Sequence, residues 1–308
     1  VGSSPTVANE TVYVGDRYHN KLHAIDIYSG DQRWVFKATG DNGGVISATV
    51  DDGTVFFRSQ DGYLYALDTD TGNQQWDFET GDQAGIDFAS SPTVIGDTVF
   101  IGSPRTLSDK GTLHALDADT GSHQWSLDTN ANILSSPTVA NGTVFVGCDD
   151  GKIYSVDAAT GDQQWESEIG SKVRVSPAVS NDIILIGSGG KLRALDTNSG
   201  DQQWSYDIEL ASPKSSPVVA NNSVFVVDRY GDLHSVDIET GQQQWVFEPV
   251  EGIGAVPTVS DGTVFLSGFP EKSRGYDPPI SLLTVNAESG NPQWTIINWG
   301  QVNRAPVV

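Results

Sequence analysis

The chain has 308 residues, of which 40 are acidic and 17 basic, so its formal net charge at pH 7 is -23. Its few cations are scattered along the sequence, which argues against the basic stripe of a nucleic-acid-binding protein. The carboxylates lie mainly in turns and lysine is scarce, so we expect an adaptation to high salt, where dissolved ions screen their mutual repulsion.

Cys148 is the only cysteine, which excludes a disulfide within the chain and a metal site built from several cysteines. It follows the apolar segment 144–147, so we expect a buried core thiol rather than a nucleophile. No apolar run is long enough to cross a bilayer, and we expect no membrane span in this chain. Because it has no Met and no signal peptide at Val1, we expect a mature or trimmed product.

One phrase returns seven times: a hydrophobic strand ending in Asp or Asn, a Thr/Ser-Gly turn, and a Trp four residues after the Gly. The pairs are Gly30/Trp34, Gly72/Trp76, Gly121/Trp125, Gly161/Trp165, Gly200/Trp204, Gly241/Trp245 and Gly290/Trp294. Successive Trp residues stand 39 to 49 positions apart, a period typical of a propeller or solenoid. We predict a single domain over 1–308, with repeats at about 3–43, 44–88, 89–132, 133–173, 174–213, 214–253 and 254–302, and a partial repeat at 303–308.

The repeat at 133–173 predicts four short strands, at 136–139, 143–147, 152–157 and 162–165. Asn-Gly and Asp-Gly between alternating β-branched segments are strong hairpin signals. A four-stranded antiparallel sheet cannot bury both faces alone, but sheets stacked radially around an axis can. We therefore predict an all-β fold, a β-propeller, in which the Trp of each fourth strand docks one blade against its neighbour.

An Asp or Asn precedes each Thr/Ser-Gly turn, and we expect its side chain to accept backbone N–H groups and fix the turn. The seven are Asp26, Asp68, Asp117, Asp157, Asp196, Asp237 and Asn286. A calcium loop is the alternative, since Asp70 and Asp119 follow two of them. Most copies lack this second carboxylate, so we predict no metal.

The copies differ most between the second and third strands, with insertions at 104–110 and 269–279. Insertions at one corner of a repeat emerge on one face of the ring, which is a plausible place for partner contact. The segment 304–308 matches the first strand of a repeat, as at 4–7. We predict seven complete repeats and the first strand of an eighth, favouring eight blades completed by sequence outside this chain, with seven blades as the alternative.

The stretch from Leu64 through Asp68 to Trp76 resembles the tryptophan-docking repeat of the quinoprotein-type (PQQ-like repeat) β-propellers, and the likeness covers residues 1–308. This family includes pyrroloquinoline quinone (PQQ) dehydrogenases, generally eight-bladed, and non-enzymatic relatives such as the outer-membrane assembly factor BamB. The dehydrogenases often carry a disulfide between adjacent cysteines and place Ca²⁺ or another metal with a catalytic Asp at the ring's centre. Cys148 alone cannot form that disulfide, and no metal-binding set stands out. We expect a chain closest to the BamB-like proteins, with no catalytic residue and no cofactor.

Two basic residues stand three positions before the inner-strand Pro, or its equivalent, of adjacent repeats: Arg174 and Lys214. Lys172 and Arg304 lie nearby in loops of the same type. We predict that these four form a positive patch at the channel mouth that binds an anionic group or an acidic partner segment. Pairing with loop carboxylates is the alternative that the sequence leaves open.

Two other features bear on contacts. Asp-Arg-Tyr at 16–18 and 228–230 is either a second contact surface or a repeated surface turn. Three histidines, His23, His114 and His234, share a third-strand position with tyrosines of other copies, and we interpret them as spacers between blades. The sequons at Asn9, Asn141 and Asn221 would accept glycans if the protein is exported.

We expect a non-catalytic scaffold for protein–protein interaction, extracellular or anchored at the cell surface or envelope, whose partner the sequence does not name. We expect a monomer that binds no nucleic acid. The alternatives are an alcohol or sugar dehydrogenase that uses PQQ with Ca²⁺, and a ligand- or glycan-sensing domain of a larger receptor.

Overall fold

The computed structural model describes residues 4–16, 18–39, 44–81, 90–104, 110–208, 216–249, 252–253, 256–269 and 279–299. The chain divides into two compact units, Val1–Glu168 (unit 1) and Ile169–Val308 (unit 2). The described residues form seven antiparallel sheets and no helix, and thus contain no helix long and apolar enough to cross a membrane. The predicted all-β fold of propeller type is confirmed, whereas a single domain over the whole chain stays a prediction.

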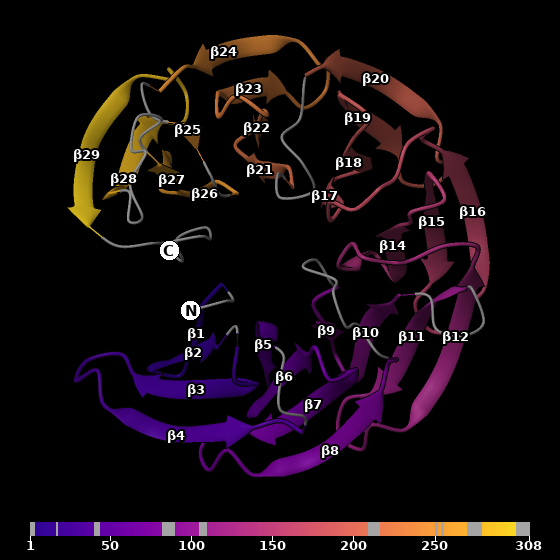
Figure 1. Cartoon of the computed structure of the whole chain (residues 1–308). Helices are drawn as coiled ribbons and strands as arrows, with labels where there is room; N and C mark the ends of the chain where they lie inside the picture. The colour runs from indigo at the N-terminus through magenta and orange to yellow at the C-terminus, as the bar shows by residue number, and fades with distance from the viewer. Residues whose placement is uncertain are drawn as a thin grey trace. The chain divides into compact units, whose positions relative to one another are not determined.

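Unit 1 contains four sheets, called blades 1 to 4, in which consecutive strands pair (Figure 1). The strands are β1 (Thr6–Ala8), β2 (Thr11–Gly15), β3 (Lys21–Asp26) and β4 (Gln32–Lys37); β5 (Val45–Asp51), β6 (Thr54–Ser59), β7 (Tyr63–Asp68) and β8 (Gln74–Glu79); β9 (Thr93–Ile95), β10 (Thr98–Ser103), β11 (Gly111–Asp117) and β12 (His123–Thr129); β13 (Thr138–Ala140), β14 (Thr143–Gly147), β15 (Lys152–Asp157) and β16 (Gln163–Glu168).

Unit 2 contains blades 5 to 7. The strands are β17 (Ala178–Ser180), β18 (Ile183–Ser188), β19 (Lys191–Asp196) and β20 (Gln202–Asp207); β21 (Val218–Ala220), β22 (Ser223–Val227), β23 (Leu233–Asp237) and β24 (Gln243–Phe247); β25 (Gly252–Ile253), β26 (Thr258–Ser260), β27 (Thr263–Phe269), β28 (Pro279–Asn286) and β29 (Pro292–Trp299). In blade 7 two short strands, β25 and β26, both pair with β27. Most of both predicted insertions, at 105–109 and 270–278, and the eighth copy at 303–308 lie outside the described residues.

The hairpin between the first two strands of each blade depends on residues that accept positive φ. In blade 4 Asn141 has φ 50° and Gly142 has φ 75°, as a type I′ turn requires at both central positions. Blade 2 makes the corresponding turn with Asp52 at 35° and Gly53 at 75°. The predicted Asn-Gly hairpin is therefore present, and the sequon asparagine Asn141 lies within this tight turn.

The Asp before each Thr/Ser-Gly turn fixes the turn, as the sequence predicted. Asp157 Oδ1 accepts the backbone N–H groups of Ala159 (3.0 Å) and Thr160 (2.9 Å), and these bonds hold the pKa of Asp157 below its usual value. In the seventh copy Asn286 Oδ1 accepts the N–H of Ser289 at 2.9 Å. An uncharged amide can thus make the same turn.

Each docked tryptophan lies on a glycine of the next blade. The indole of Trp76 is 8% exposed, and its Nε1 donates to the carbonyl oxygen of Ala118 at 2.8 Å. A Cβ added to Gly121 would stand only 2.7 Å from the indole ring. The same contact joins Trp34 to Gly72, Trp125 to Gly161, Trp204 to Gly241 and Trp245 to Gly290. Only glycine leaves room for the ring at this turn.

Trp165 is the tryptophan that is predicted to dock blade 4 on the next blade. It lies on β16, the last strand of unit 1, and is half-buried, as the docked Trp125 and Trp204 are. Its ring packs on Phe145 of its own blade, with centroids 5.9 Å apart. The turn that the repeat would pair with it, at Gly200, belongs to unit 2. The structure thus gives Trp165 a contact within blade 4, and its role in docking the next blade stays a prediction.

The first glycine and the last tryptophan of the series differ from the docked pairs. No atom of the described residues lies within 4 Å of a Cβ built on Gly30, and Ile27 in the same turn is 45% exposed. Trp294, on β29, is 44% exposed. Trp294 therefore contributes less buried apolar surface than the docked tryptophans do.

Threonine hydroxyls join the first strands of consecutive blades in unit 1. The Oγ1 atoms donate to carbonyl oxygens of the following blade, Thr6 to Ala48 (2.6 Å), Thr49 to Pro92 (2.7 Å) and Thr93 to Pro137 (2.6 Å). Blades 1 and 2 also share a hydrophobic cluster that includes Tyr13, Leu22, Val45, Phe57 and Tyr65. Consecutive blades are thus joined by hydroxyls at the first strand, by apolar packing in the middle and by indole at the fourth strand.

Replacing Gly72 by Ala tests the indole contact against a matched position. Gly53 has a similar φ, +75° against +70°, but nothing lies within 4 Å of its added Cβ, whereas the Cβ of Gly72→Ala would meet the Trp34 ring at 2.6 Å. Both variants carry the strain of a left-handed alanine, about 1–2 kcal/mol. We expect Gly72→Ala to lose a further ~1–3 kcal/mol from overpacking. Urea unfolding measures both, and equal losses would contradict the role of the contact.

Replacing Asp157 by Asn tests the turn carboxylates through pH. The pKa of Asp157 is lower in the folded chain than its ordinary value of 3.8. Its stabilising contribution is therefore present above that value and is lost as pH falls through the folded pKa. We expect Asp157→Asn to lose less unfolding free energy than wild type between pH 7 and pH 3, by urea unfolding. Asp119→Asn, in the corresponding turn of blade 3, should behave as wild type, and an unchanged slope for Asp157→Asn would contradict the assignment.

Candidate functional site

The structure places two of the four residues of the predicted cationic patch. Lys172 and Arg174 lie in unit 2, in the loop before β17, where Lys172 is exposed, Arg174 is half-buried and Val173 between them is buried. Lys214 and Arg304 lie outside the described residues. The structure therefore does not bring the four together, and the patch stays a prediction.

The position that Arg174 occupies in its repeat is held by a buried apolar residue in two other copies. The equivalent residues in unit 1 are Val45 and Leu134, which are 2% and 6% exposed. The loop of Arg174 is held by Ser188, whose Oγ lies 2.9 Å and 3.0 Å from the carbonyl oxygens of Ser171 and Lys172. Arg174 thus lies in a loop that Ser188 holds in place, at a position of the repeat where two other copies bury an apolar side chain.

Arg58, which sequence reasoning missed, is the largest fully buried side chain of the described residues. It lies on β6 in unit 1, and its Nη1 donates to the carbonyl oxygen of Gly102 on β10 at 2.5 Å. Burial lowers the pKa of Arg58 to about 9, so it stays protonated at neutral pH. One sequence signal could have pointed to Arg58. At the same position of the second strand, four other copies of the repeat have glycine: Gly15, Gly102, Gly147 and Gly187.

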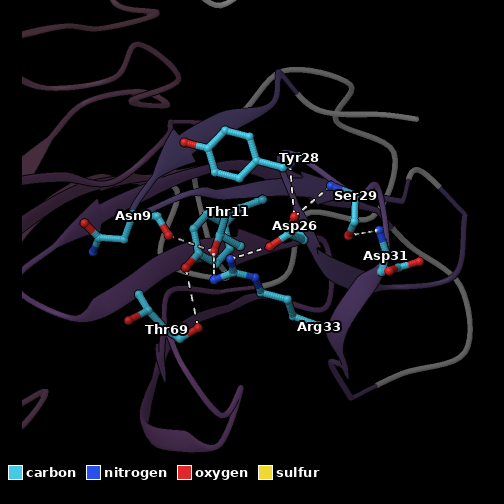
Figure 2. A network of polar contacts seen from close by, with 9 residues as sticks. Asn9, Thr11, Asp26, Tyr28, Ser29, Asp31, Arg33 and Thr69 are labelled. Carbon is cyan, nitrogen blue, oxygen red and sulfur yellow. Dashed lines mark hydrogen bonds and ion pairs between the residues drawn. The ribbon is translucent and has the colours of Figure 1, made fainter.

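A second arginine, Arg33, is held by a network of polar contacts in blade 1 (Figure 2). Arg33 donates from Nη2 to Asp26 Oδ2 at 2.6 Å and from Nη1 to Thr11 Oγ1 at 2.8 Å. The guanidinium, with the turn's N–H groups, holds the pKa of Asp26 well below its usual range. In blade 2 a glutamine occupies this register, and Gln75 Oε1 accepts from Thr54 Oγ1 at 3.1 Å. Arg33 therefore contacts the threonine hydroxyl, as the glutamine of blade 2 does, and in addition binds the carboxylate of Asp26.

The Asp-Arg-Tyr turn of blade 1 presents a tyrosine to solvent. Asp16 Oδ1 accepts the N–H of Tyr18 at 2.9 Å, and Oδ2 lies 2.8 Å from His19 Nδ1. The bond from the Tyr18 N–H is the largest influence that lowers the pKa of Asp16. Tyr18 is 69% exposed. The carboxylate fixes the backbone while the phenol projects outward.

The corresponding turn of blade 6 has the same form. Asp228 Oδ1 accepts the N–H of Tyr230 at 2.9 Å and that of Asp232 at 2.8 Å. Tyr230 is 60% exposed, and the Arg229 guanidinium lies 4.7 Å from its ring centroid. The other carboxylate oxygen, Oδ2, is 3.5 Å from His234 Nε2. Asp228 is only 7% exposed, so it is a rigid support for the exposed tyrosine.

The shared third-strand position lies between blades. Tyr65 packs on Phe36 of blade 1, with ring centroids 5.4 Å apart, and His234 Nδ1 lies 3.1 Å from the Tyr206 hydroxyl of blade 5. These contacts agree with the predicted role of the histidines as spacers.

The described residues do not fit the donor set that the dehydrogenases of this fold imply. They contain no group of three or more His, Cys, Asp or Glu side chains able to hold a metal ion. Cys148 is buried, its Sγ lies 3.4 Å from the carbonyl oxygen of Ala131, and burial raises the pKa of its thiol to about 11. A thiol in this setting is a core group and has no second cysteine to pair with.

Solved structures share this fold at low sequence identity. BamB from Moraxella catarrhalis is 19% identical, with a TM-score of 0.71, over 97% of this chain and 83% of that chain. A europium-containing methanol dehydrogenase is 14% identical, with a TM-score of 0.75, over 99% and 80%. Quinohemoprotein alcohol dehydrogenase from Comamonas testosteroni is 16% identical, with a TM-score of 0.76, over 99% and 68%.

In sequence, 110 residues are 27% identical to a lanthanide-dependent methanol dehydrogenase of Methylacidiphilum fumariolicum. This stretch covers 32% of the chain and 18% of that enzyme. The sequence model described as outer membrane protein assembly factor BamB matches residues 1–106, 92–217 and 211–307. The indole-docked blades and this match along nearly the whole length show that the chain belongs to the BamB-like family of PQQ-like repeat β-propellers.

Proposed function

We propose that this chain is a non-catalytic β-propeller scaffold that binds a protein partner at the cell surface or envelope. The observation that carries the proposal is the pair of Asp-Arg-Tyr turns. In each turn a carboxylate holds the backbone and leaves a tyrosine, Tyr18 or Tyr230, more than half exposed. Tyrosine and arginine are enriched at protein interfaces, where they provide much of the binding energy.

The rigidity of the frame supports this role. Asp16 and Asp228 fix the two turns before any partner arrives, so little conformational entropy is lost on binding. The family relation adds support, since the name of BamB describes a factor that takes part in assembling outer membrane proteins. A surface of fixed loops on a rigid frame suits a scaffold that binds a protein partner and catalyses no reaction.

A second candidate is a PQQ-dependent alcohol dehydrogenase, favoured by the sequence match to a methanol dehydrogenase and by the similar folds of such enzymes. The donor set of the described residues opposes it, as does the single buried cysteine. We therefore propose that the chain binds no quinone. Adding PQQ with Ca²⁺ or a lanthanide should give no bound chromophore and no dye reduction with methanol or ethanol, and either signal would overturn the proposal.

The double variant Tyr18→Ser/Tyr230→Ser tests the contact turns. We expect it to capture the partner from native extract at high salt at least about tenfold less well than wild type, because truncating a buried interface tyrosine costs about 2 kcal/mol. Quantitative pull-down with mass spectrometry measures the change. Ile95→Ser, at a 54% exposed residue of β9 outside these turns, is the matched control. Equal capture by the double variant, or equal loss with the control, would contradict the proposal.

The cationic loop is separable in the same assay. Lys172→Ser/Arg174→Ser removes both described cations of the predicted patch and leaves the two tyrosine turns intact. If the partner binds through the tyrosines, this variant should capture it as wild type does. If only the cationic variant lost partner capture, the binding contact would lie in the loop before β17 instead of the tyrosine turns.

A further inference from the structure

Blade 3 contains two neighbouring imidazoles. His114 lies on β11 and His123 on β12, with ring centroids 6.1 Å apart and planes at 75°. The register shift between Ala115 and Leu116 places His123 opposite Leu116, so both histidines project from the same face of the sheet. Phe78, from β8 of blade 2, packs against both rings, at 5.3 Å from His114 and 6.2 Å from His123.

The buried Nδ1 of His114 makes no hydrogen bond to any described residue. An unpartnered buried polar atom is rare and calls for a physical explanation. The half-buried ring leaves this atom no access to water, because its own exposed area is essentially zero. A ligand that accepts an imidazole lone pair would satisfy it.

Equivalent histidines in two other blades show why this atom lacks a partner. In blade 1, His23 Nδ1 lies 3.1 Å from Gln32 Oε1. In blade 6, His234 Nδ1 lies 3.1 Å from the Tyr206 hydroxyl, which donates to Gln243 Oε1 at 2.6 Å. The same atom thus faces the first residue of the fourth strand, directly or through a hydroxyl.

Blade 3 has replaced both partners. His123 occupies the register of the glutamine, and Phe78 occupies that of the tyrosine. The result is a second imidazole where the other blades place an amide oxygen, under a ring that offers no hydroxyl. The two substitutions remove a hydrogen bond and create a pair of nitrogen donors.

The separation of the rings is close to that of two imidazoles on one metal ion. At the tetrahedral angle that Zn²⁺ prefers, Zn–N bonds of about 2.1 Å place the two ring centroids roughly 5.3 Å apart. The observed separation is 6.1 Å, so the two rings would move closer together by roughly 1 Å on binding an ion. Burial lowers the pKa of His114 to about 4, so its ring is neutral at pH 7, the form that binds metals.

We propose that His114, through Nδ1, and His123 bind one divalent transition metal ion such as Zn²⁺, with water in the remaining positions. Because the described residues supply no third His, Cys, Asp or Glu to such a site, two protein ligands hold the ion. His123 is exposed and opens the site to solvent, while Phe78 packs against both imidazole rings. The ion would join the third and fourth strands of blade 3, independently of the partner contacts proposed above.

Zinc titration of the intact chain tests the proposal. High salt screens the general attraction of cations to the carboxylates, so isothermal titration calorimetry should report one Zn²⁺ site per chain. His123→Gln restores the residue found in blades 1 and 6 and should weaken binding more than about tenfold, because one of two ligands is lost. His19→Gln, at an exposed histidine beside Asp16, should bind Zn²⁺ as wild type does.

A second variant and a second readout keep the test independent of folding. His114→Tyr introduces the residue of blades 2 and 4, and it should fold and also lose the site. Zinc should raise the Tm of wild type and of His19→Gln but not of the other two variants, since only a ligand of the folded state stabilises it. Imidazole NMR signals of two histidines should shift together at one equivalent of Zn²⁺. Equal zinc affinity in wild type and His123→Gln, or shifts at other histidines, would overturn the proposal.

Discussion

The contact on which both units depend is that of an indole with a glycine of the following blade. The indole needs a turn without a Cβ and an accessible carbonyl oxygen, and the Thr/Ser-Gly turn supplies both, as at Gly121 and Ala118 under Trp76. The turn in turn needs its Asp, whose carboxylate accepts the N–H groups that would otherwise splay the loop, as at Asp117. Trp, Gly and Asp therefore act together as one structural unit that joins consecutive blades.

Much of this frame could be predicted from the sequence, because its signals are local. An Asn-Gly turn with positive φ at both residues, such as 141–142, depends only on the chemistry of those residues. The partner of each tryptophan is a different matter. Trp34 and Gly30 stand four positions apart in the sequence, yet the indole lies on Gly72. Spacing within a repeat fixes which strand carries the ring, but only the arrangement of consecutive sheets determines which turn receives it.

The candidate sites were less predictable, because the position of a residue in the repeat does not by itself determine how deeply its side chain is buried. Arg174 shares its register with Val45 and Leu134, which are buried, so a cation there does not stand on an open rim by position alone. Arg58 gives no unusual pattern within its own strand, and its burial depends on Gly102 of the next blade. Charge and alternation describe one strand, whereas burial is a property of two neighbouring sheets.

The differences between copies follow from the same constraint. Since the indole contact holds consecutive blades, residues at other registers can change without loss of the frame, and each change alters one local contact. Arg33 in place of glutamine links a hydroxyl to the turn carboxylate, whereas His123 in place of glutamine leaves the buried Nδ1 of His114 without a hydrogen-bond partner among the described residues. The Arg33 substitution adds hydrogen bonds to the network, whereas the His123 substitution removes one. A repeat that withstands the loss of such a bond can exchange it for a ligand. Among the described residues of unit 1, blade 3 is therefore where an added ion would satisfy a buried side-chain nitrogen that the protein leaves without a partner.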